Sequence, residues 1–293
     1  MLTLSPRLVF FAGKGGVGKT TCAASVALQL ARANPGQRYT LISVDPAHAV
    51  RDVFATEAAP ENLTIEALDT RAKWLRFRDT LGKEIERAID ALTPSGLTVA
   101  YDTEALQKLI EVAPPGADEL FAVNRLAHLA SDDSVSKVIV DTAPTGHFLR
   151  LLDLPVTAAE WVREFMRILL RYRELIPAGS LGEELVNASR SLTALSETLH
   201  SDRAGVVVVT RPERVVVAET IRLIADLERR RIGIAGIVAN YVTPANDCPC
   251  DQSMRAHENA VLRGLPGQPV EVERQDWPVT RLDDLARLVS FSP

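Results

Sequence analysis

A glycine-rich segment, GKGGVGKTT at residues 13–21, directly follows the apolar run LVFF. It contains the pattern G-x-x-x-x-G-K-[ST], which binds nucleotide phosphates where a strand passes into a helix. Glycines let backbone N–H groups point at phosphate oxygens, and the helix N-terminus adds positive potential. Lys19 is predicted to contact the β- and γ-phosphates, and the Thr20 hydroxyl to bind Mg²⁺. The predicted phosphate-binding residues are Gly13, Lys14, Gly15, Gly16, Val17, Gly18, Lys19, Thr20 and Thr21.

Short apolar runs are expected to form the strands that position this segment. They are Leu8–Ala12, Tyr39–Val44, Lys137–Val140, Gly205–Val209 and Ile234–Ala239. Continuous apolar runs suit parallel strands that are buried on both faces. Helical patterns, notably 21–33 and 214–231, lie between them. The sequence therefore predicts an α/β fold with a doubly wound, mostly parallel sheet that binds ligands at the carboxyl ends of its strands.

Two stretches, about 70–130 and 155–200, interrupt the alternation of strands and helices and have mostly helical patterns. Breaks containing proline and glycine divide them into shorter helices. We expect residues 1–293 to form a single P-loop NTPase domain, with a helical subdomain built from these two insertions. Two independent domains are the less favoured arrangement.

Two further segments lie where predicted strands end. They are ISVDPAHAVRDVF (42–54) and VIVDTAPTGHFLRLL (138–152). Together with GKGGVGKTT, they closely resemble the family of the bacterial arsenite-pump ATPase and the tail-anchored-protein targeting ATPase. PPGADEL (114–120), TRPERVVVAETIRLI (210–224) and VANYV (238–242) extend the resemblance over most of the chain. The resemblance implies an ATPase that requires Mg²⁺ and acts as a homodimer.

The second lysine of the loop, Lys14, is not needed to build the phosphate cradle. GKGGVGKT is the deviant Walker A signature of a class in which this lysine reaches the nucleotide of a facing subunit. The resemblance therefore implies that Lys14 acts in trans, as an arginine finger does, by neutralising charge that develops during phosphoryl transfer. The alternative is a solvated surface lysine.

Carboxylates at two expected strand ends are candidates for the chemistry of hydrolysis. The resemblance gives Asp45 the role of orienting or activating the attacking water, and Asp141 the role of holding Mg²⁺ through a water. With Thr20, both aspartates are predicted residues of the Mg²⁺ site. Each carboxylate alone could instead cap a turn. The N–H of Gly146 could approach the γ-phosphate and so link phosphate loss to movement of its loop. His48 and His147 are interpreted as conformational or interface residues.

The adenine site is assigned from the resemblance. Asn240 matches the family's adenine-contacting asparagine, Arg211 and Pro212 are expected to help form the base pocket, and Val270 and Glu271 are weaker candidates. The amide of Asn240 can both donate and accept hydrogen bonds. The chain shows no guanine-binding Asn/Thr-Lys-x-Asp motif.

Cys248-Pro249-Cys250 lies in a polar segment, NDCPCDQ. The targeting branch carries Cys-x-x-Cys here, and two of its subunits share one Zn²⁺; this chain departs from it by one residue. Two cysteines per protomer would still supply four thiolates across a two-fold axis, as tetrahedral zinc requires. Redox-sensitive thiols and the absence of any role are the alternatives. Cys22 is expected to be buried in the core.

A client-binding surface is one interpretation of the second insertion, which contains TAAEWVREFMRILLRYRELI. Its apolar residues at helical spacing are Trp161, Phe165, Ile168, Leu169 and Tyr172. Such a stripe could pack on neighbouring helices or, paired in a dimer, form a groove for a hydrophobic client helix. The chain contains only 3 methionines, which argues against the adaptable surface that promiscuous helix binding favours.

Composition excludes several classes of protein. The net charge is −5 in 293 residues, which gives no sign of nucleic-acid binding. No apolar run approaches the roughly 20 residues that span a bilayer. Without a signal-peptide pattern, and with an odd number of cysteines, a cytoplasmic location is expected.

The sequence therefore predicts a homodimeric ATPase that uses ATP and Mg²⁺ to open and close a helical, client-binding subdomain for membrane-protein targeting or chaperoning. The alternative is the energising subunit of an arsenite or anion efflux pump, which would have a membrane pump subunit as its partner. A partition ATPase is disfavoured because DTAPTGH and the helical insertions are absent from that branch.

Overall fold

A computed structural model of the chain describes residues 2–45, 49–54, 58–69, 119–171, 179–275, 279 and 281–292. It divides into two compact units. The first comprises Met1–Leu68, Leu129–Leu149 and Glu197–Pro293, and the second comprises Asp69–His128 and Arg150–Ser196.

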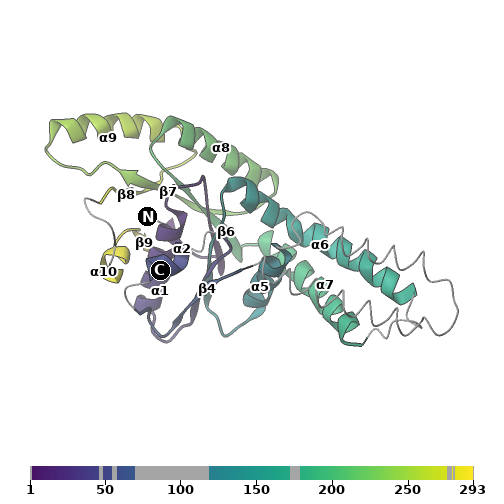
Figure 1. Cartoon of the computed structure of the whole chain (residues 1–293). Helices are drawn as coiled ribbons and strands as arrows, with labels where there is room; N and C mark the ends of the chain where they lie inside the picture. The colour runs from purple at the N-terminus through teal and green to yellow at the C-terminus, as the bar shows by residue number, and fades with distance from the viewer. Residues whose placement is uncertain are drawn as a thin grey trace. The chain divides into compact units, whose positions relative to one another are not determined.

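The first unit is built on a seven-stranded sheet, drawn in Figure 1, with the strand order β4-β3-β5-β2-β6-β7-β8. All of its neighbouring strands pair in parallel. The strands are β2 (Leu8–Ala12), β3 (Tyr39–Ser43), β4 (Leu63–Ala67), β5 (Lys137–Asp141), β6 (Ala204–Thr210), β7 (Ile234–Val242) and β8 (Val270–Glu273). The expected α/β fold with a parallel sheet is confirmed.

At the central strand β2, the order in which the chain adds strands to the sheet reverses. From β2 the chain builds β3, β4 and β5 on one side, and then β6, β7 and β8 on the other. A loop at such a point opens into a crevice at the carboxyl ends of the strands, where α/β proteins bind ligands. The glycine-rich loop follows β2 directly.

The outermost strands were not predicted from the sequence. In β4 and β8, buried and exposed residues are mixed, as in LTIEA and VEVE, whereas β2, β3 and β6 are buried throughout. An edge strand is paired on one side only and exposes part of its surface, so it lacks the continuous apolar run of an inner strand.

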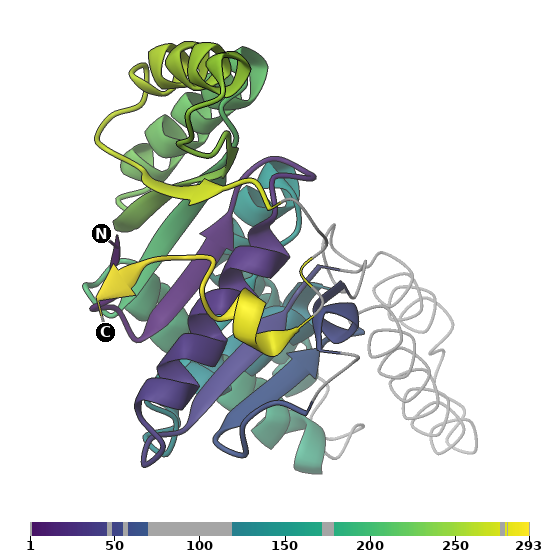
Figure 2. The same cartoon turned by 90° about the vertical axis from the view of Figure 1, so that its left-hand side faces the viewer.

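Helix α1 (Lys19–Ala33) packs on β2, β3 and β5 and supplies much of the core, with Val26, Ala27 and Leu28 fully buried. Figure 2 shows the C-terminal segment, with α10 (Leu282–Leu285), running across this helix. The Gln29 side chain donates a hydrogen bond to the carbonyl of Val289 at 2.8 Å. The short strands β1 (Leu2–Thr3) and β9 (Phe291–Ser292) pair in parallel and bring the two ends of the chain together.

The other described helices of the first unit follow its later strands: α2 (Ala49–Val53) after β3, α8 (Arg214–Arg229) after β6, and α9 (Pro249–Leu262) after β7. In the second unit the described elements are helical. They come from α5 (Glu119–Ser131), α6 (Thr145–Arg171) and α7 (Gly179–Leu199), whose ends reach into the first unit.

Helix α6 starts before the helical stretch that the sequence predicts at about 155–200. It begins at Thr145 and continues through Pro155 to Arg171, so the end of the DTAPTGH motif lies in the same helix as the start of the second insertion. A proline inside a helix removes one backbone hydrogen bond without necessarily ending the helix. The side chains of the predicted apolar stripe, and all of Tyr172, lie outside what the structure describes. Within the described ranges, no helix is both long enough and apolar enough to cross a membrane.

Candidate active site

The glycine-rich loop wraps tightly between β2 and α1. Gly13 has φ 149°, and a Cβ added there would lie 2.2 Å from the carbonyl oxygen of Val209, so no larger residue fits. Gly18 has φ 94°, in the left-handed region that glycine enters without strain, and immediately precedes the first residue of α1. The loop therefore places the first N–H groups of α1 toward the space at the end of β2, as a phosphate cradle requires.

Lys19 begins α1, and its side chain folds back into the loop. Its ammonium group donates a hydrogen bond to the backbone carbonyl of Lys14 at 3.3 Å. Burial lowers the pKa of Lys19, although the carboxylates of Asp141 and Asp45 favour its charged form. A phosphate group would supply the negative charge that this buried lysine lacks.

Asp141 lies at the end of β5 and is completely buried. One of its oxygens, Oδ2, accepts hydrogen bonds from the Thr20 hydroxyl at 2.9 Å and from the Ser43 hydroxyl at 3.0 Å. Its other oxygen, Oδ1, is buried and has no hydrogen-bond partner among the residues that the structure describes. Burial raises the pKa of Asp141 to about 6.

These groups fit a Mg²⁺ ion. An unsatisfied buried oxygen costs about 1–3 kcal/mol, and a water on a bound Mg²⁺ would satisfy Oδ1. Mg²⁺ prefers oxygen ligands and keeps several waters. The Thr20 hydroxyl retains lone pairs after donating to Asp141, so it could bind the ion directly while Asp141 binds through water.

Asp45 follows β3 at the same edge of the sheet. Its backbone N–H donates to the Ser43 hydroxyl at 3.3 Å, and its carboxylate is close enough to act electrostatically on both Lys19 and Asp141. The structure therefore brings Asp45, Asp141, Lys19 and Thr20 together at adjacent strand ends. His48 lies outside the described residues.

Gly146 lies in the first turn of α6, in the part of that helix that belongs to the first unit. The first N–H groups of a helix have no carbonyl partner within it. Both Gly146 and His147 are exposed. The segment is thus the start of a helix rather than the loop that the sequence predicted, and a helix N-terminus favours anionic ligands as well.

The side chain of Lys14 pairs with a residue outside its own loop. Its ammonium group lies 3.3 Å from a carboxylate oxygen of Glu219 on α8, and the two side chains are 36% and 31% exposed. The ion pair links Lys14 to α8.

A cavity of about 540 Å³ opens beside the glycine-rich loop. Gly16, Gly18 and Thr21 form one part of its lining, and Arg211 and Asn240 form another. Pro212 is not among the described lining residues. On β8, the described residues that line the cavity are Val272 and Glu273, and not the predicted candidates Val270 and Glu271. Gln275, beyond the strand, also lines it.

The amide of Asn240 is engaged within the protein at both ends. Its Nδ2 donates to the carbonyl of Val17 at 2.8 Å, and its Oδ1 accepts the N–H of Tyr241 at 2.9 Å. The residue therefore joins the end of β7 to the glycine-rich loop. Its predicted contact with adenine stays a prediction.

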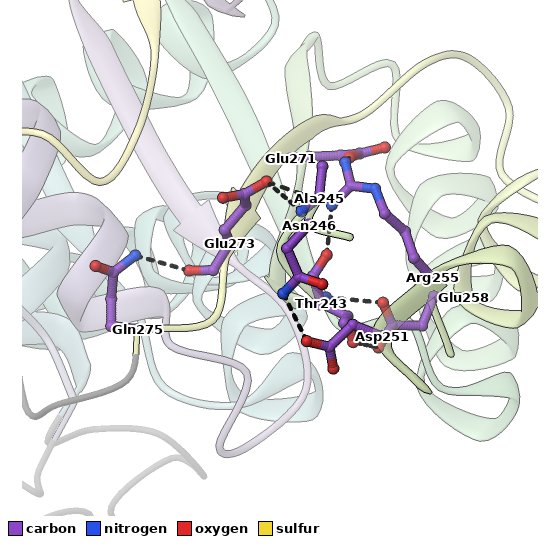
Figure 3. Close-up of polar contacts among 9 residues, drawn as sticks. All are labelled: Thr243, Ala245, Asn246, Asp251, Arg255, Glu258, Glu271, Glu273 and Gln275. Atoms are coloured by element: carbon purple, nitrogen blue, oxygen red, sulfur yellow. Dashed lines mark hydrogen bonds and ion pairs between the residues drawn. The ribbon is translucent and has the colours of Figure 1, made fainter. Parts of the chain in front are cut away.

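A polar network fixes the wall of the cavity that β8 provides (Figure 3). Arg255 on α9 pairs with Glu271 at 2.7 Å and Glu273 at 3.4 Å, and also donates to the carbonyl of Thr243. Glu258, which is buried, accepts hydrogen bonds of 2.8 Å from both the N–H and the hydroxyl of Thr243. The network ties α9 and β8 to the end of β7.

Comparison with known proteins identifies the family. A sequence model described as anion-transporting ATPase matches residues 6–265. The chain belongs to the anion-transporting ATPase family. It is an ATP hydrolase that uses ATP and Mg²⁺, and the site described above is its candidate nucleotide site.

Curated relatives of this ATPase carry two kinds of name. It is 28% identical over 288 residues to the putative arsenical pump-driving ATPase 2 of Aquifex aeolicus, covering 93% of the chain and 92% of that protein. It is 30% identical over 254 residues to an ATPase ASNA1 homolog of Dictyostelium discoideum, covering 82% and 74%. It is 31% identical over 257 residues to ATPase GET3 of Kluyveromyces lactis, covering 80% and 72%.

The three cysteines of the ATPase lie in two different environments. Cys22 is buried in α1, and burial raises the pKa of its thiol to about 12, so it is protonated at neutral pH. Cys248 and Cys250 are exposed; Cys248 precedes α9 and Cys250 lies in its first turn, which places the pair on a helix start rather than in a loop. Within the described residues, no group of three or more His, Cys, Asp or Glu side chains could hold a metal ion.

Ser43 is a functional residue that the sequence analysis missed. Its hydroxyl bonds to Asp141 and also accepts the N–H of Asp45, so it positions both carboxylates. A serine two residues before a strand-end aspartate was the available signal. Glu219 and Tyr241 had no comparable signal, because only the folded chain brings them to the site.

The raised pKa of Asp141 predicts a pH-dependent stability in the nucleotide-free protein. Between the ordinary pKa of 3.8 and about 6, the folded state binds more protons than the unfolded state. The free energy of unfolding therefore falls as pH rises through this range, by up to about 3 kcal/mol. Asp141→Asn should lack this loss. The free energy of unfolding of this variant, measured by urea titration, should therefore rise relative to that of wild type from pH 4 to pH 6. A constant difference between the two proteins would contradict the prediction.

Proposed function

We propose that this ATPase works as a homodimer in which ATP hydrolysis opens and closes a helical subdomain, formed by the second unit, that binds an apolar client helix. The observation that carries the proposal is the direction of Lys14. Its partly exposed side chain pairs with Glu219 on α8, outside its own loop. A cation that is not used by its own site is available to a facing subunit.

The Glu219 ion pair does not oppose this role. Exposed ion pairs typically contribute only about 0–1 kcal/mol, because water screens both charges. The phosphates of a second nucleotide carry several negative charges, and a closed dimer excludes water from them, so they attract Lys14 more strongly than one exposed carboxylate does. Lys14 would therefore exchange Glu219 for the partner's nucleotide as the dimer closes.

Within each proposed site, four groups have separate tasks. Lys19 and the N–H groups of the loop bind the β- and γ-phosphates, and Thr20 and Asp141 hold Mg²⁺, with Asp45 close to the metal. Mg²⁺, when bound, neutralises charge on the phosphates. Asp45 orients the attacking water and accepts its proton. Gly146 senses the γ-phosphate at the start of α6, and α6 continues into the second unit.

Targeting or chaperoning of membrane-protein helices is the activity that we favour, through that helical subdomain. One supporting feature is the length of α6, a helix of 27 residues that begins at the proposed γ-phosphate sensor. Relatives named ATPase GET3 and ATPase ASNA1 homolog support the same assignment. We place the protein in the cytoplasm and propose no nucleic-acid partner, in keeping with its net charge of −5.

The second candidate is the energising subunit of an arsenite or anion pump, working with a membrane subunit. The name of the Aquifex aeolicus relative favours it. The described cysteines do not, because arsenite binding needs three thiolates and Cys22 is buried in α1 and protonated, whereas Cys248 and Cys250 are exposed at α9.

The deciding experiment measures mass and client capture together. With Mg²⁺, ADP and aluminium fluoride, light scattering should show twice the mass of the nucleotide-free chain, and the closed dimer should retain a labelled hydrophobic helix. A chain that stays monomeric in the trapped state would contradict the homodimer. Arsenite-stimulated turnover that is lost in Cys248→Ser would instead favour the pump.

An interfacial zinc ion between two copies of Cys248 and Cys250 is part of the proposal. Both thiols are exposed and lie on one helix start, so a two-fold axis beside α9 would assemble four of them. Metal analysis should find one zinc per two chains in the wild type and none in Cys248→Ser. A matched Cys22→Ser variant should keep its zinc. Zinc content that does not respond to Cys248→Ser would reject the site and leave redox chemistry or no role for the pair.

A further inference from the structure

Tyr241 is an extra residue in the last part of β7. Asn240 pairs with Val272 and Val242 with the next residue of β8, Glu273, so Tyr241 has no partner in the register. Such a bulge turns a side chain in a direction that a regular strand does not allow, and bulges are common beside active sites. The backbone of Tyr241 has φ 68°, a left-handed conformation that is unfavourable for a bulky residue.

The ring that this backbone presents is not packed into the core. Tyr241 is 49% exposed, so burial of its ring contributes little to the stability of the fold. The guanidinium carbon of Arg211 lies 4.3 Å from the centroid of the ring, so the cation covers part of it. The surrounding structure keeps both the strained backbone and the exposed ring. Strain of this kind is found chiefly at functional sites.

Tyr241 and Arg211 lie on the wall of the cavity beside the glycine-rich loop. The preceding residue, Asn240, is bonded to the carbonyl of Val17, and its Oδ1 holds the N–H of Tyr241. These two hydrogen bonds tie the backbone of Tyr241 to the loop that forms the phosphate cradle. A platform held at a constant distance from bound phosphates is what the base of a nucleotide needs.

We infer that the ring of Tyr241, with Arg211 beside it, forms the surface on which the base of the nucleotide stacks. This rests on the nucleotide site proposed above and adds to it a residue that binds the base. Aromatic rings and guanidinium groups both stack on purines, and each base contributes substantially to affinity. Stacking uses the π-face that every purine has, so Tyr241 provides affinity for the base without choosing between adenine and guanine.

The test measures binding rather than turnover, in the intact chain, by titration calorimetry with Mg²⁺ and ADP. Tyr241→Ala should raise the dissociation constant for ADP about tenfold, whereas Tyr241→Phe, which keeps the ring, should stay within about twofold of wild type. The dissociation constant for GDP should rise by the same factor as that for ADP. Pyrophosphate, which has no base, should bind equally well to all three proteins.

A third variant, Tyr241→Gly, separates stacking from backbone strain. Glycine adopts a positive φ without strain, so this variant should melt no lower than wild type and yet lose ADP affinity as Tyr241→Ala does. Unchanged ADP affinity in Tyr241→Gly and Tyr241→Ala would overturn the inference, as would an equal loss of pyrophosphate affinity. If the wild type itself failed to bind ADP, the nucleotide site proposed above would be wrong instead.

Discussion

The Lys14→Ala variant is expected to hydrolyse ATP about a thousandfold more slowly than wild type, with ADP affinity little changed. A cation supplied by a neighbouring subunit typically accelerates phosphoryl transfer by about 10³–10⁵, because it stabilises charge that develops only in the transition state. Lys19, which is buried in the loop, should still hold the ground-state phosphates. Steady-state kinetics at a protein concentration that saturates dimer formation gives the measurement.

Glu219→Gln is the matched control for this prediction. It removes the same ion pair as Lys14→Ala but leaves the lysine in place. Because an exposed pair contributes little, the variant should fold normally and keep its turnover within about threefold of wild type. A loss in Glu219→Gln as large as that in Lys14→Ala would mean that the ion pair itself, and not a cation acting in trans, supports hydrolysis.

Mixing two inactive variants tests whether Lys14 acts in trans. In a mixed dimer of Lys14→Ala and Asp45→Asn, one site combines an intact Asp45 with the partner's intact Lys14. Random exchange of equal amounts should make about half the dimers mixed, each with one working site, and restore about a quarter of the wild-type rate. A lysine that acted only within its own chain would give no recovery.

The second large effect is expected at Asp45. Asp45→Asn should lower kcat by about 10³-fold, since general-base groups contribute roughly 10²–10⁴ and asparagine cannot accept the proton of the water. Nucleotide should still bind, because the cradle and Thr20 are unchanged. Single-turnover hydrolysis together with ADP affinity measures the two properties separately.

Asp52→Asn, in the nearby helix α2, is the control for Asp45→Asn. Asp52 is exposed, so its loss should leave both kcat and ADP affinity as in wild type. Hydrolysis by Asp45→Asn at more than about a tenth of the wild-type rate would exclude Asp45 as the general base. Asp141 would not be an alternative base, since its Oδ2 already accepts two hydrogen bonds and its other oxygen is buried.

Much of the fold was predictable because the inner strands carry a local signal. A parallel strand buried on both faces must be apolar along its length, and Leu8–Ala12 was expected with the bounds that it has in the structure. The edge strands β4 and β8 were missed because exposure permits polar residues such as Glu66 and Glu271 within them. Helix α6 starts at Thr145, before the helical stretch expected from about 155, and runs through Pro155.

The nucleotide chemistry of this protein could be predicted from local sequence patterns. The residues of the glycine-rich loop are contiguous, and the two aspartates end strands that any parallel sheet brings to one edge. Their spacing was sufficient to predict that the chain binds nucleotide phosphates and Mg²⁺, whereas ATP and the family followed from the resemblance of the motifs.

The surroundings of these groups depend on contacts that form only in the folded chain. The hydrogen bond between Asn240 and Val17 joins residues 223 positions apart, and the direction of Tyr241 depends on a register shift between β7 and β8. Likewise, Glu219 meets Lys14 only because α8 packs where it does. Such contacts follow from strand register and helix packing, which are set by the whole core. No local pattern of residues records them.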